Sequence, residues 1–302
     1  MAAEGRRAYP TAAAGYGQAM VRSRRSCLSV PGSSERMLAK AAGLPADEVV
    51  IDLEDSVVPE RKQEARDLGL RALHSWEGPP VAVRINPLSS EWGRQDVAEL
   101  LGAGDALGSL VVPKVESASE LAEVDRLLGR GSALGLQALI ETAAGLGQVT
   151  EIAGASSRLE TLITGYADLA ASLGRPPGAD YPGDRWHWVR SSVLVAARAA
   201  GLQAIDGPHL EIADLHGLRV EAGWARALGF DGKWALHPSQ IEPLNEAFSP
   251  TKEEVDRATE VLDALARGGH RGAALLDGEM IDEASRKLAA QVVARGRAAG
   301  LV

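Results

Sequence analysis

Short apolar segments alternate with amphipathic segments along most of the chain. Eight runs rich in Val, Ile and Leu predict β-strands, at residues 27–30, 48–53, 81–85, 109–113, 135–140, 159–164, 202–205 and 234–237. Helical periodicity lies between them, for example at 37–42, 62–73, 119–128 and 188–200. Strands that alternate with helices pair in parallel, so eight such units predict an α/β fold, a (β/α)8 TIM barrel.

The turn after the first strand argues against the structural alternative, a doubly wound open sheet. Such a sheet usually carries a glycine-rich phosphate-binding turn at this point. Here residues 30–34 read VPGSS, which lacks that fingerprint. The barrel is therefore favoured.

The chain extends beyond the predicted barrel at both ends. Residues 1–21 are rich in Ala, Gly and Arg and are expected to form a disordered leader. Residues 22–250 form the expected barrel, and residues 251–302 a C-terminal helical lid or arm. Its first helix is indicated by a capping box at Thr251 and Glu254, and a glycine-rich link precedes a last helix that ends near Arg297.

Composition excludes several classes of protein. The 302 residues carry 32 Lys and Arg against 41 Asp and Glu, a net charge of −9, and only 4% are aromatic, which disfavours nucleic-acid binding. The sequence contains no run of 18 apolar residues, so it predicts no membrane-spanning helix. One cysteine, Cys27, forms no internal disulfide, and no Cys/His cluster indicates zinc. A cytoplasmic protein is expected.

Ionisable side chains follow seven of the eight predicted strands. In a parallel barrel these strand ends meet at one face, which is where the active sites of such barrels lie. Each side chain alone is compatible with a solvated strand end or a helix cap, but together they predict an active site. The residues are Asp52, Glu54, Asp55, Arg84, Lys114, Glu141, Asp168, Asp206 and His237.

Glu141 and Asp168 follow the fifth and sixth strands, so their carboxylates are expected to meet. Two carboxylates without His or Cys suit Mg²⁺, which keeps several waters. Glu54 and Asp55 would then hydrogen-bond the waters of the metal. The alternative is a buried ion network between Glu141 and neighbouring cations, and the spacing alone leaves both open.

Arg84 lies in a strand that is predicted to be buried, so its guanidinium needs an anionic partner. It can bind a substrate carboxylate, or pair with Asp52 or Glu54. Arg84 and Lys114 are also the cations of the alternative network around Glu141. A separate basic cluster, Arg22, Arg24 and Arg25, precedes the first strand. Such a cluster is either a solvated tail or a site for the phosphates of an anionic ligand.

Motifs in order along residues 22–300 resemble the citrate lyase beta-subunit-like family, which includes malyl-CoA and citramalyl-CoA lyases and malyl-CoA thioesterases. The matching segments are 25–32 (RSCLSVPG), 52–55 (DLED), 62–66 (KQEAR), 84–86 (RIN), 113–116 (PKVE), 140–142 (IET), 165–169 (GYADL), 204–208 (AIDGP), 229–233 (GFDGK), 237–240 (HPSQ) and 280–282 (MID).

This resemblance implies a (β/α)8 barrel with Mg²⁺ held by Glu141 and Asp168, and with Arg84 on the carboxylate of a 2-oxo acid. It implies a coenzyme A thioester as substrate and a homotrimer or hexamer. Asp282, in the Met-Ile-Asp segment, would lie on a C-terminal lid that covers the active site of a neighbouring subunit and would move a proton at the acyl carbon.

The expected activity is Mg²⁺-dependent, reversible carbon–carbon cleavage of a 3-hydroxyacyl-CoA, such as malyl-CoA or citramalyl-CoA, to an acyl-CoA and a 2-oxo acid. Lys114 and backbone amides at Ala167 and Asp168 would help to bind the substrate, and Arg25 would bind the CoA phosphates. Three alternatives remain: a malyl-CoA-type thioesterase, the citryl-acyl-carrier lyase subunit of citrate lyase, and a non-catalytic acyl-CoA-binding protein.

Overall fold

Eight parallel strands form a closed barrel in a computed structural model that describes residues 22–176, 184–267 and 273–301. All eight predicted strands are confirmed. Strand β8 pairs with β1, which closes the barrel and rules out an open sheet. The strands are β1 (Ser26–Pro31), β2 (Glu48–Asp52), β3 (Val81–Arg84), β4 (Leu107–Val112), β5 (Gly135–Ile140), β6 (Leu159–Thr164), β7 (Gln203–Asp206) and β8 (Gly232–Ala235).

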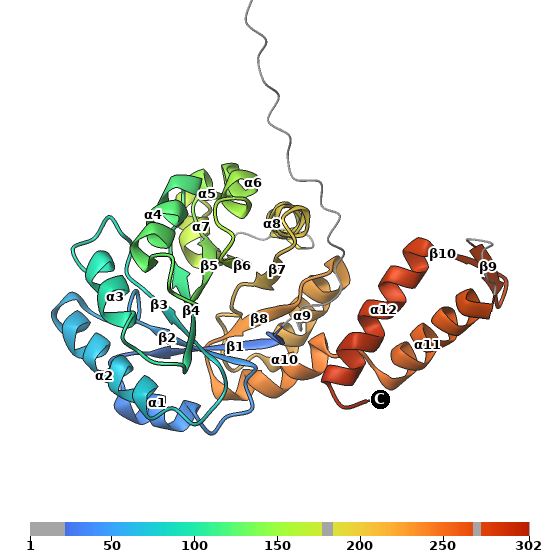
Figure 1. The fold of residues 1–302 in the computed structure, drawn as a ribbon, viewed down its shortest axis with the longest axis horizontal. Coiled ribbons are helices and arrows are strands. Elements are labelled where there is room, and N and C mark those ends of the chain that lie inside the picture. The colour runs from blue at the N-terminus through green and yellow to red at the C-terminus, as the bar shows by residue number, and fades with distance from the viewer. Residues whose placement is uncertain (1–21, 177–183, 268–272, 302) are drawn as a thin grey trace, which may run out of the picture.

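Helices surround the barrel (Figure 1). Their apolar faces and the outward side chains of the strands form one large core, because each amphipathic helix buries its hydrophobic side against the sheet. They are α1 (Glu35–Ala41), α2 (Lys62–His74), α3 (Gly93–Leu100), α4 (Ala118–Leu128), α5 (Ala143–Gly147), α6 (Val149–Ala153), α7 (Tyr166–Ser172), α8 (His187–Ala199), α9 (Leu215–Leu228) and α10 (Ile241–Phe248), with short 3-10 helices η1 (Pro59–Arg61) and η2 (Pro238–Gln240).

The inside of the barrel is filled by an apolar layer, with one side chain from each strand. Side chains alternate between the two faces of a strand, so the residue two positions further along also points inward. That residue is Asp52 on β2, Arg84 on β3 and, directly after the end of β5, Glu141. The fold therefore places these charged groups directly above the apolar layer, which consists of Cys27, Val50, Ala82, Val111, Leu139, Ile163, Ile205 and Trp234.

Polar side chains fill the opposite, amino-terminal end of the barrel. Arg24 donates from Nε to Glu48 at 3.1 Å and from Nη1 to Gln203 at 2.5 Å. Gln137 donates to Glu48 at 3.0 Å and accepts from Thr161 at 3.0 Å. Because these buried polar groups hydrogen-bond one another, structural contacts fill the amino-terminal end of the barrel. An active site is therefore expected at the carboxyl-terminal end.

A separate arm follows the barrel and extends away from it (Figure 1). It consists of α11 (Lys252–Arg267), β9 (Ala273–Leu276), β10 (Glu279–Asp282) and α12 (Glu283–Ala298). The predicted capping box is confirmed: Glu254 N–H donates to Thr251 Oγ1 at 3.2 Å, and Thr251 N–H to the Glu254 carboxylate at 2.8 Å. The antiparallel β9–β10 hairpin was not predicted. The small core of the arm contains Ala258, Ala289 and Val293.

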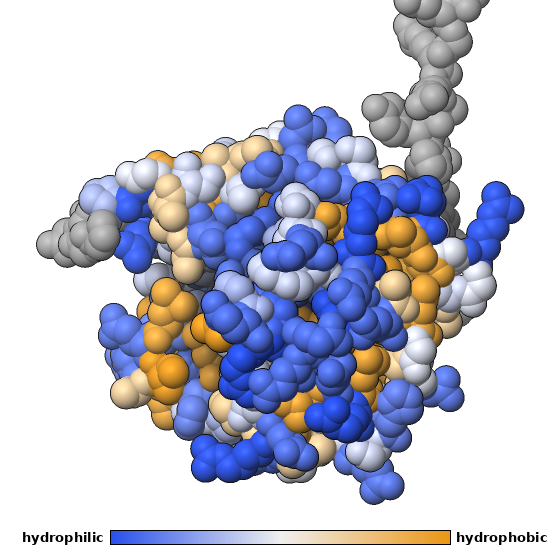
Figure 2. Space-filling model, turned by 90° about the vertical axis from the view of Figure 1, so that its left-hand side faces the viewer, coloured by the Kyte–Doolittle hydropathy of each residue, from blue (hydrophilic) through white to orange (hydrophobic). Residues whose placement is uncertain are grey.

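The surface that faces away from the arm is mostly hydrophilic, with hydrophobic patches between the polar residues (Figure 2). Among the described residues, no helix is long and apolar enough to cross a membrane. The expected leader, residues 1–21, lies outside the described part of the chain.

Candidate active site

Arg84 is the central cation at the carboxyl-terminal end of the barrel. Its Nε and Nη2 donate to the two carboxylate oxygens of Asp52, both at 2.6 Å, and Nη1 lies 3.1 Å from Glu54. Asp52 also accepts from the backbone N–H groups of Glu54 and Ser56. Burial raises the pKa of Asp52, but the hydrogen bonds and charge of Arg84 outweigh burial and the pKa is lowered. Arg84 thus pairs with both Asp52 and Glu54, which is one of the two interpretations that the sequence leaves open.

Lys114 links several carboxylates of this end of the barrel. It follows β4 with a left-handed φ of 50°, a conformation that is rare outside glycine. In this conformation its backbone N–H donates to Glu141 Oε1 at 2.9 Å. Its ammonium group contacts Glu54 and lies 3.2 Å from Asp55 and 3.8 Å from Asp168. Burial lowers the pKa of Lys114, but these carboxylates reverse that effect and the pKa is raised.

Glu141 carries a buried carboxyl group with a raised pKa. The residue is 2% exposed. Burial, reinforced by the negative charges of Glu54 and Asp168, raises the pKa of Glu141 to about 8 against the opposing effects of Arg84 and the N–H of Lys114. The structure therefore brings Glu141, Asp168 and Lys114 together, as the sequence predicts.

Gly165 allows the Glu141 carboxylate to approach the start of α7. A Cβ at position 165 would lie 2.6 Å from both Cβ and Oε2 of Glu141, a distance that real Cβ contacts do not show. Gly165 is also the N-cap residue of α7, which carries Asp168 in its first turn. Only glycine fits against Glu141 here, so the residue that begins the helix carrying Asp168 packs directly on the Glu141 side chain.

Replacing Gly165 with alanine should disturb both carboxylates. We expect Gly165→Ala to reduce kcat/KM at least about tenfold and to lower the melting temperature, because the new methyl group must displace Glu141 or α7. The matched control is Gly223→Ala on α9, where an added Cβ meets no atom within 4 Å. That variant should keep full activity and match or exceed the parent stability. An active, undisturbed Gly165→Ala enzyme would contradict this description of the site.

The donor set fits a hard divalent cation. In residues 22–176, 184–267 and 273–301, no three acidic, His or Cys side chains are arranged to hold a metal ion. Mg²⁺ needs fewer, since one or two carboxylates with water and substrate oxygens commonly suffice. Glu141 and Asp168 supply two carboxylates of the preferred type. Burial is the main cause of the raised pKa of Glu141, and a bound cation would favour the ionised form of this carboxyl group.

Ala167 directly precedes the metal-ligand candidate Asp168 in the sequence, and it lines a pocket. It belongs to the first turn of α7, whose backbone N–H groups have no intrahelical acceptors. The pocket has a volume of about 360 Å³. Its lining residues are Ala167, Ala170, Ala171, Arg175, Pro176, Arg185 and Trp186.

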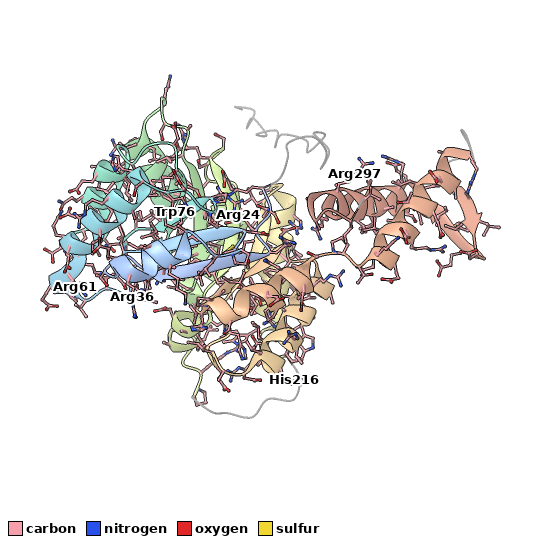
Figure 3. All side chains as sticks on the ribbon, turned by 90° about the horizontal axis from the view of Figure 1, so that it is seen from below. Arg24, Arg36, Arg61, Trp76, His216 and Arg297 are labelled. Atoms are coloured by element: carbon pink, nitrogen blue, oxygen red, sulfur yellow. The ribbon has the colours of Figure 1, made fainter. Side chains whose placement is uncertain are left out.

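The structure does not bring Arg25 to this site. Arg25 precedes β1 and therefore lies at the amino-terminal end of the barrel, where it donates two hydrogen bonds to the Asp47 carboxylate and one to Ser249, all at 2.8 Å. Its neighbour Arg24 lies on the side of the barrel toward the arm, whereas Arg36 and Arg61, which follow β1 and β2, lie on the far side (Figure 3). The expectation that Arg25 binds the CoA phosphates is thus corrected, because Arg25 lies at the end of the barrel opposite to the candidate site of its own chain.

Asp282 also lies away from the site of its own chain. It ends β10, at the far end of the arm (Figure 1). There its carboxylate caps α12 by accepting from the backbone N–H groups of Ala284 at 2.9 Å and Ser285 at 3.1 Å. A role in catalysis therefore requires that Asp282 act on another copy of the chain.

One supporting residue was not predicted. Lys62, at the start of α2, donates from its buried ammonium group to the backbone carbonyls of Leu53 and Glu54, both at 2.8 Å. These contacts fix the turn that presents Glu54 and Asp55. The only sequence signal was its place in the segment 62–66, which carries no chemistry by itself.

The profile of the HpcH/HpaI aldolase/citrate lyase family matches residues 25–238, which include the whole barrel. The chain belongs to this family. An L-malyl-CoA/beta-methylmalyl-CoA lyase from Cereibacter sphaeroides is 36% identical over 299 residues, which cover 90% of this chain and 94% of that protein. A (3S)-malyl-CoA thioesterase from the same species is 38% identical over 280 residues, which cover 91% and 95%.

Two solved structures are similar to this chain, and they cover different shares of it. The crystal structure of the protein CitE from Mycobacterium tuberculosis, in complex with magnesium, acetoacetate and coenzyme A, is 34% identical with a TM-score of 0.74, and the match covers 91% of this chain and 98% of that one. The citrate lyase beta subunit from M. tuberculosis, complexed with oxaloacetate and magnesium, is 35% identical with a TM-score of 0.65 and covers 76% and 99%.

Proposed function

We propose that the protein is a Mg²⁺-dependent lyase that cleaves, or forms, the carbon–carbon bond of a 3-hydroxyacyl-CoA such as malyl-CoA or citramalyl-CoA. The products of cleavage are an acyl-CoA and a 2-oxo acid. The observation that carries the proposal is the cluster of Glu141, Asp168 and Arg84 at the carboxyl-terminal end of the barrel. Lyase relatives that match nine-tenths of the chain support it.

The side chains of the cluster would bind different parts of the metal–substrate complex. Glu141 and Asp168 would hold Mg²⁺, which supplies Lewis-acid stabilisation of the oxygen that becomes the oxo group. Arg84 uses Nε and one proton on each Nη for Asp52 and Glu54, so two N–H groups remain for the carboxylate of the oxo acid. Asp52 orients the guanidinium through two hydrogen bonds, which prepares it for a second, bidentate anion.

Other groups complete the substrate site. The backbone N–H groups of Ala167 and Asp168 would hold the oxo acid from the first turn of α7. Lys114 would bind substrate oxygens while its ammonium group stays close to Glu54 and Asp55. These two carboxylates would accept hydrogen bonds from waters of the metal. A buried Cys27 and this acyl-CoA chemistry fit a cytoplasmic enzyme.

A neighbouring subunit would supply the acid–base group. The hairpin at the end of the arm exposes Leu275 by 76% and Met280 by 75%, which is unusual for apolar side chains unless another surface covers them. We infer a homotrimer or hexamer in which this hairpin covers the site of a neighbour and presents Asp282. Asp282 would then move the proton on or off the acyl carbon.

The thioesterase is the second candidate, because a thioesterase relative is as similar as the lyases. Malyl-CoA distinguishes the two activities by its products. We expect acetyl-CoA and glyoxylate to appear together, at equal rates and only with Mg²⁺, with little free CoA. Malate and free CoA as the main products would instead establish hydrolysis.

Substrate choice is tested by a panel of malyl-, methylmalyl-, citramalyl- and citryl-CoA, with chromatography of the products. We expect turnover of at least one free CoA ester. Preferences among them should be modest, since one methyl group in a pocket is worth about 1–3 kcal/mol. Inactivity on every free ester, with activity on a citryl-acyl-carrier protein, would instead identify the citrate lyase subunit.

A further inference from the structure

Tyr166 joins the start of α7 to the neighbouring wall of the barrel. Its hydroxyl donates to Oδ1 of Asp206, the last residue of β7. Asp168 lies two residues further along the same helical turn. We propose that Tyr166 is a positioning residue, which sets the place of the Asp168 carboxylate and thereby the affinity of the site for a divalent cation. This inference rests on the proposed function, since it assigns a role toward the metal proposed there.

The phenol ring of Tyr166 is enclosed on several sides. It stacks on Trp186 with 4.8 Å between ring centroids, and the charged groups of Arg190 and Lys233 lie 5.3 and 5.7 Å from its centroid. A Cβ at Gly207, the residue directly after β7, would lie 2.8 Å from the ring, so the backbone at the end of β7 also approaches the ring closely. The ring is therefore held in one orientation between β7, β8 and α8.

Asp206 is a fixed point to which α7 can be anchored. The residue is fully buried and accepts from Lys233 Nζ at 2.6 Å, from Arg190 Nε at 3.1 Å and from Thr164 Oγ1 at 3.3 Å. Burial raises the pKa of Asp206, but the charges of Lys233 and Arg190 outweigh burial and the pKa is lowered. The carboxylate stays ionised, and the Tyr166 hydroxyl adds a hydrogen bond to a charged acceptor, which is a strong type.

Asp168 itself has few other restraints. Within the described residues its carboxylate has one ion pair, the 3.8 Å contact with Lys114, and its side chain is 39% exposed. Helix α7 has seven residues, too few to be stable without tertiary contacts. The position of Asp168 therefore depends on what holds the first turn. The buried side chains of that turn are Tyr166 and Leu169, and of these two Tyr166 alone can form a side-chain hydrogen bond to the barrel.

Tyr166→Phe removes the hydroxyl and keeps the ring. Asp206 retains Lys233, Arg190 and Thr164, so no buried charge is left unpaired and the variant should fold. Calorimetric titration of the metal-free full-length protein with Mg²⁺ alone, without substrate, should show Kd raised about tenfold. In the assay the Mg²⁺ concentration for half activity should rise equally, while kcat at saturating Mg²⁺ stays within about twofold of the parent.

Ser26→Ala is the matched control, because it also removes one buried hydroxyl. Ser26 donates to Asn245 at 2.7 Å at the amino-terminal end of the barrel. The Ser26→Ala variant should lower the melting temperature about as much as Tyr166→Phe does, without changing the Mg²⁺ Kd. An unchanged Kd in Tyr166→Phe, beside a parent that binds Mg²⁺, would overturn the positioning role, as would an equal loss of affinity in Ser26→Ala. A parent protein that shows no Mg²⁺ binding would instead contradict the proposed function itself, and this inference with it.

Discussion

Glu141→Gln is expected to abolish turnover and at the same time to stabilise the metal-free protein. Loss of one of two metal-ligand carboxylates should reduce kcat/KM by about 10³-fold or more, because Lewis-acid stabilisation is worth several kcal/mol. The same substitution removes a buried group that is costly to ionise. The glutamine Oε1 can still accept the hydrogen bond from the backbone of Lys114, so the local contact is preserved.

The raised pKa of Glu141 determines how the stability difference between variant and parent changes with pH. Glu141 has a pKa of about 8 in the folded protein, against an ordinary value near 4.5 in the unfolded chain. Between these values the folded state binds more protons than the unfolded state, so the free energy of unfolding of the metal-free parent falls as pH rises. Glutamine does not titrate. The stability advantage of the variant should therefore grow from pH 5 to pH 8, to about 2–4 kcal/mol, and then level off.

Thermal and urea unfolding in EDTA at several pH values measures this difference. Glu151→Gln is the matched control, because Glu151 is exposed on α6 and should show neither effect. Saturating Mg²⁺ should stabilise the parent and leave Glu141→Gln unchanged, since only the parent binds it tightly. Two results would contradict a raised pKa of Glu141 in the folded protein. One is a variant that is less stable than the parent in EDTA at pH 8, and the other is a stability difference that does not depend on pH.

The sequence was sufficient for the barrel and for the part of the site that the barrel builds directly. Each buried strand gives a clear apolar run, and the alternation of side chains then fixes what faces inward. Asp52, Arg84 and Glu141 stand two positions after inward apolar residues, so their convergence follows from strand direction alone. The same rule explains the error at Arg25: a residue that precedes a strand of a parallel barrel lies at the opposite end from one that follows it.

Contacts between distant segments could not be predicted in this way. The left-handed conformation of Lys114 and the approach of Gly165 to Glu141 depend on how β4, β5 and α7 pack together, and no local pattern encodes them. The β9–β10 hairpin was missed because each strand has only four residues, and only one of those eight residues is buried. Of its apolar side chains, Ile281 is buried, whereas Leu275 and Met280 are exposed, so the hairpin lacks the buried apolar run that marks the strands of the barrel.

Asp282→Asn tests the last element of the proposed site, the acid–base group at the end of the arm. Turnover should fall by about 10²–10⁴-fold, the usual contribution of general acid–base catalysis. Asparagine caps a helix as well as aspartate does, so α12 should keep its start and the hairpin its shape. Mg²⁺ affinity, measured by titration calorimetry, should be unchanged. An active Asp282→Asn enzyme would remove Asp282 from the mechanism.

Complementation between two inactive variants then shows which copy Asp282 serves. Glu141→Gln chains carry an intact Asp282, and Asp282→Asn chains carry an intact Glu141. If each arm covers a neighbour, a site in a mixed oligomer is complete when its barrel comes from the second variant and its arm from the first. Random mixing of equal amounts makes about a quarter of the sites complete. Purification of co-expressed chains through two different tags removes the unmixed oligomers. The mixed oligomers should therefore regain about a third of the parent activity if they are trimers, and about a quarter if they are hexamers, whereas oligomers of either variant alone stay inactive. Mixed oligomers no more active than the separate variants would mean that no arm completes a neighbour's site.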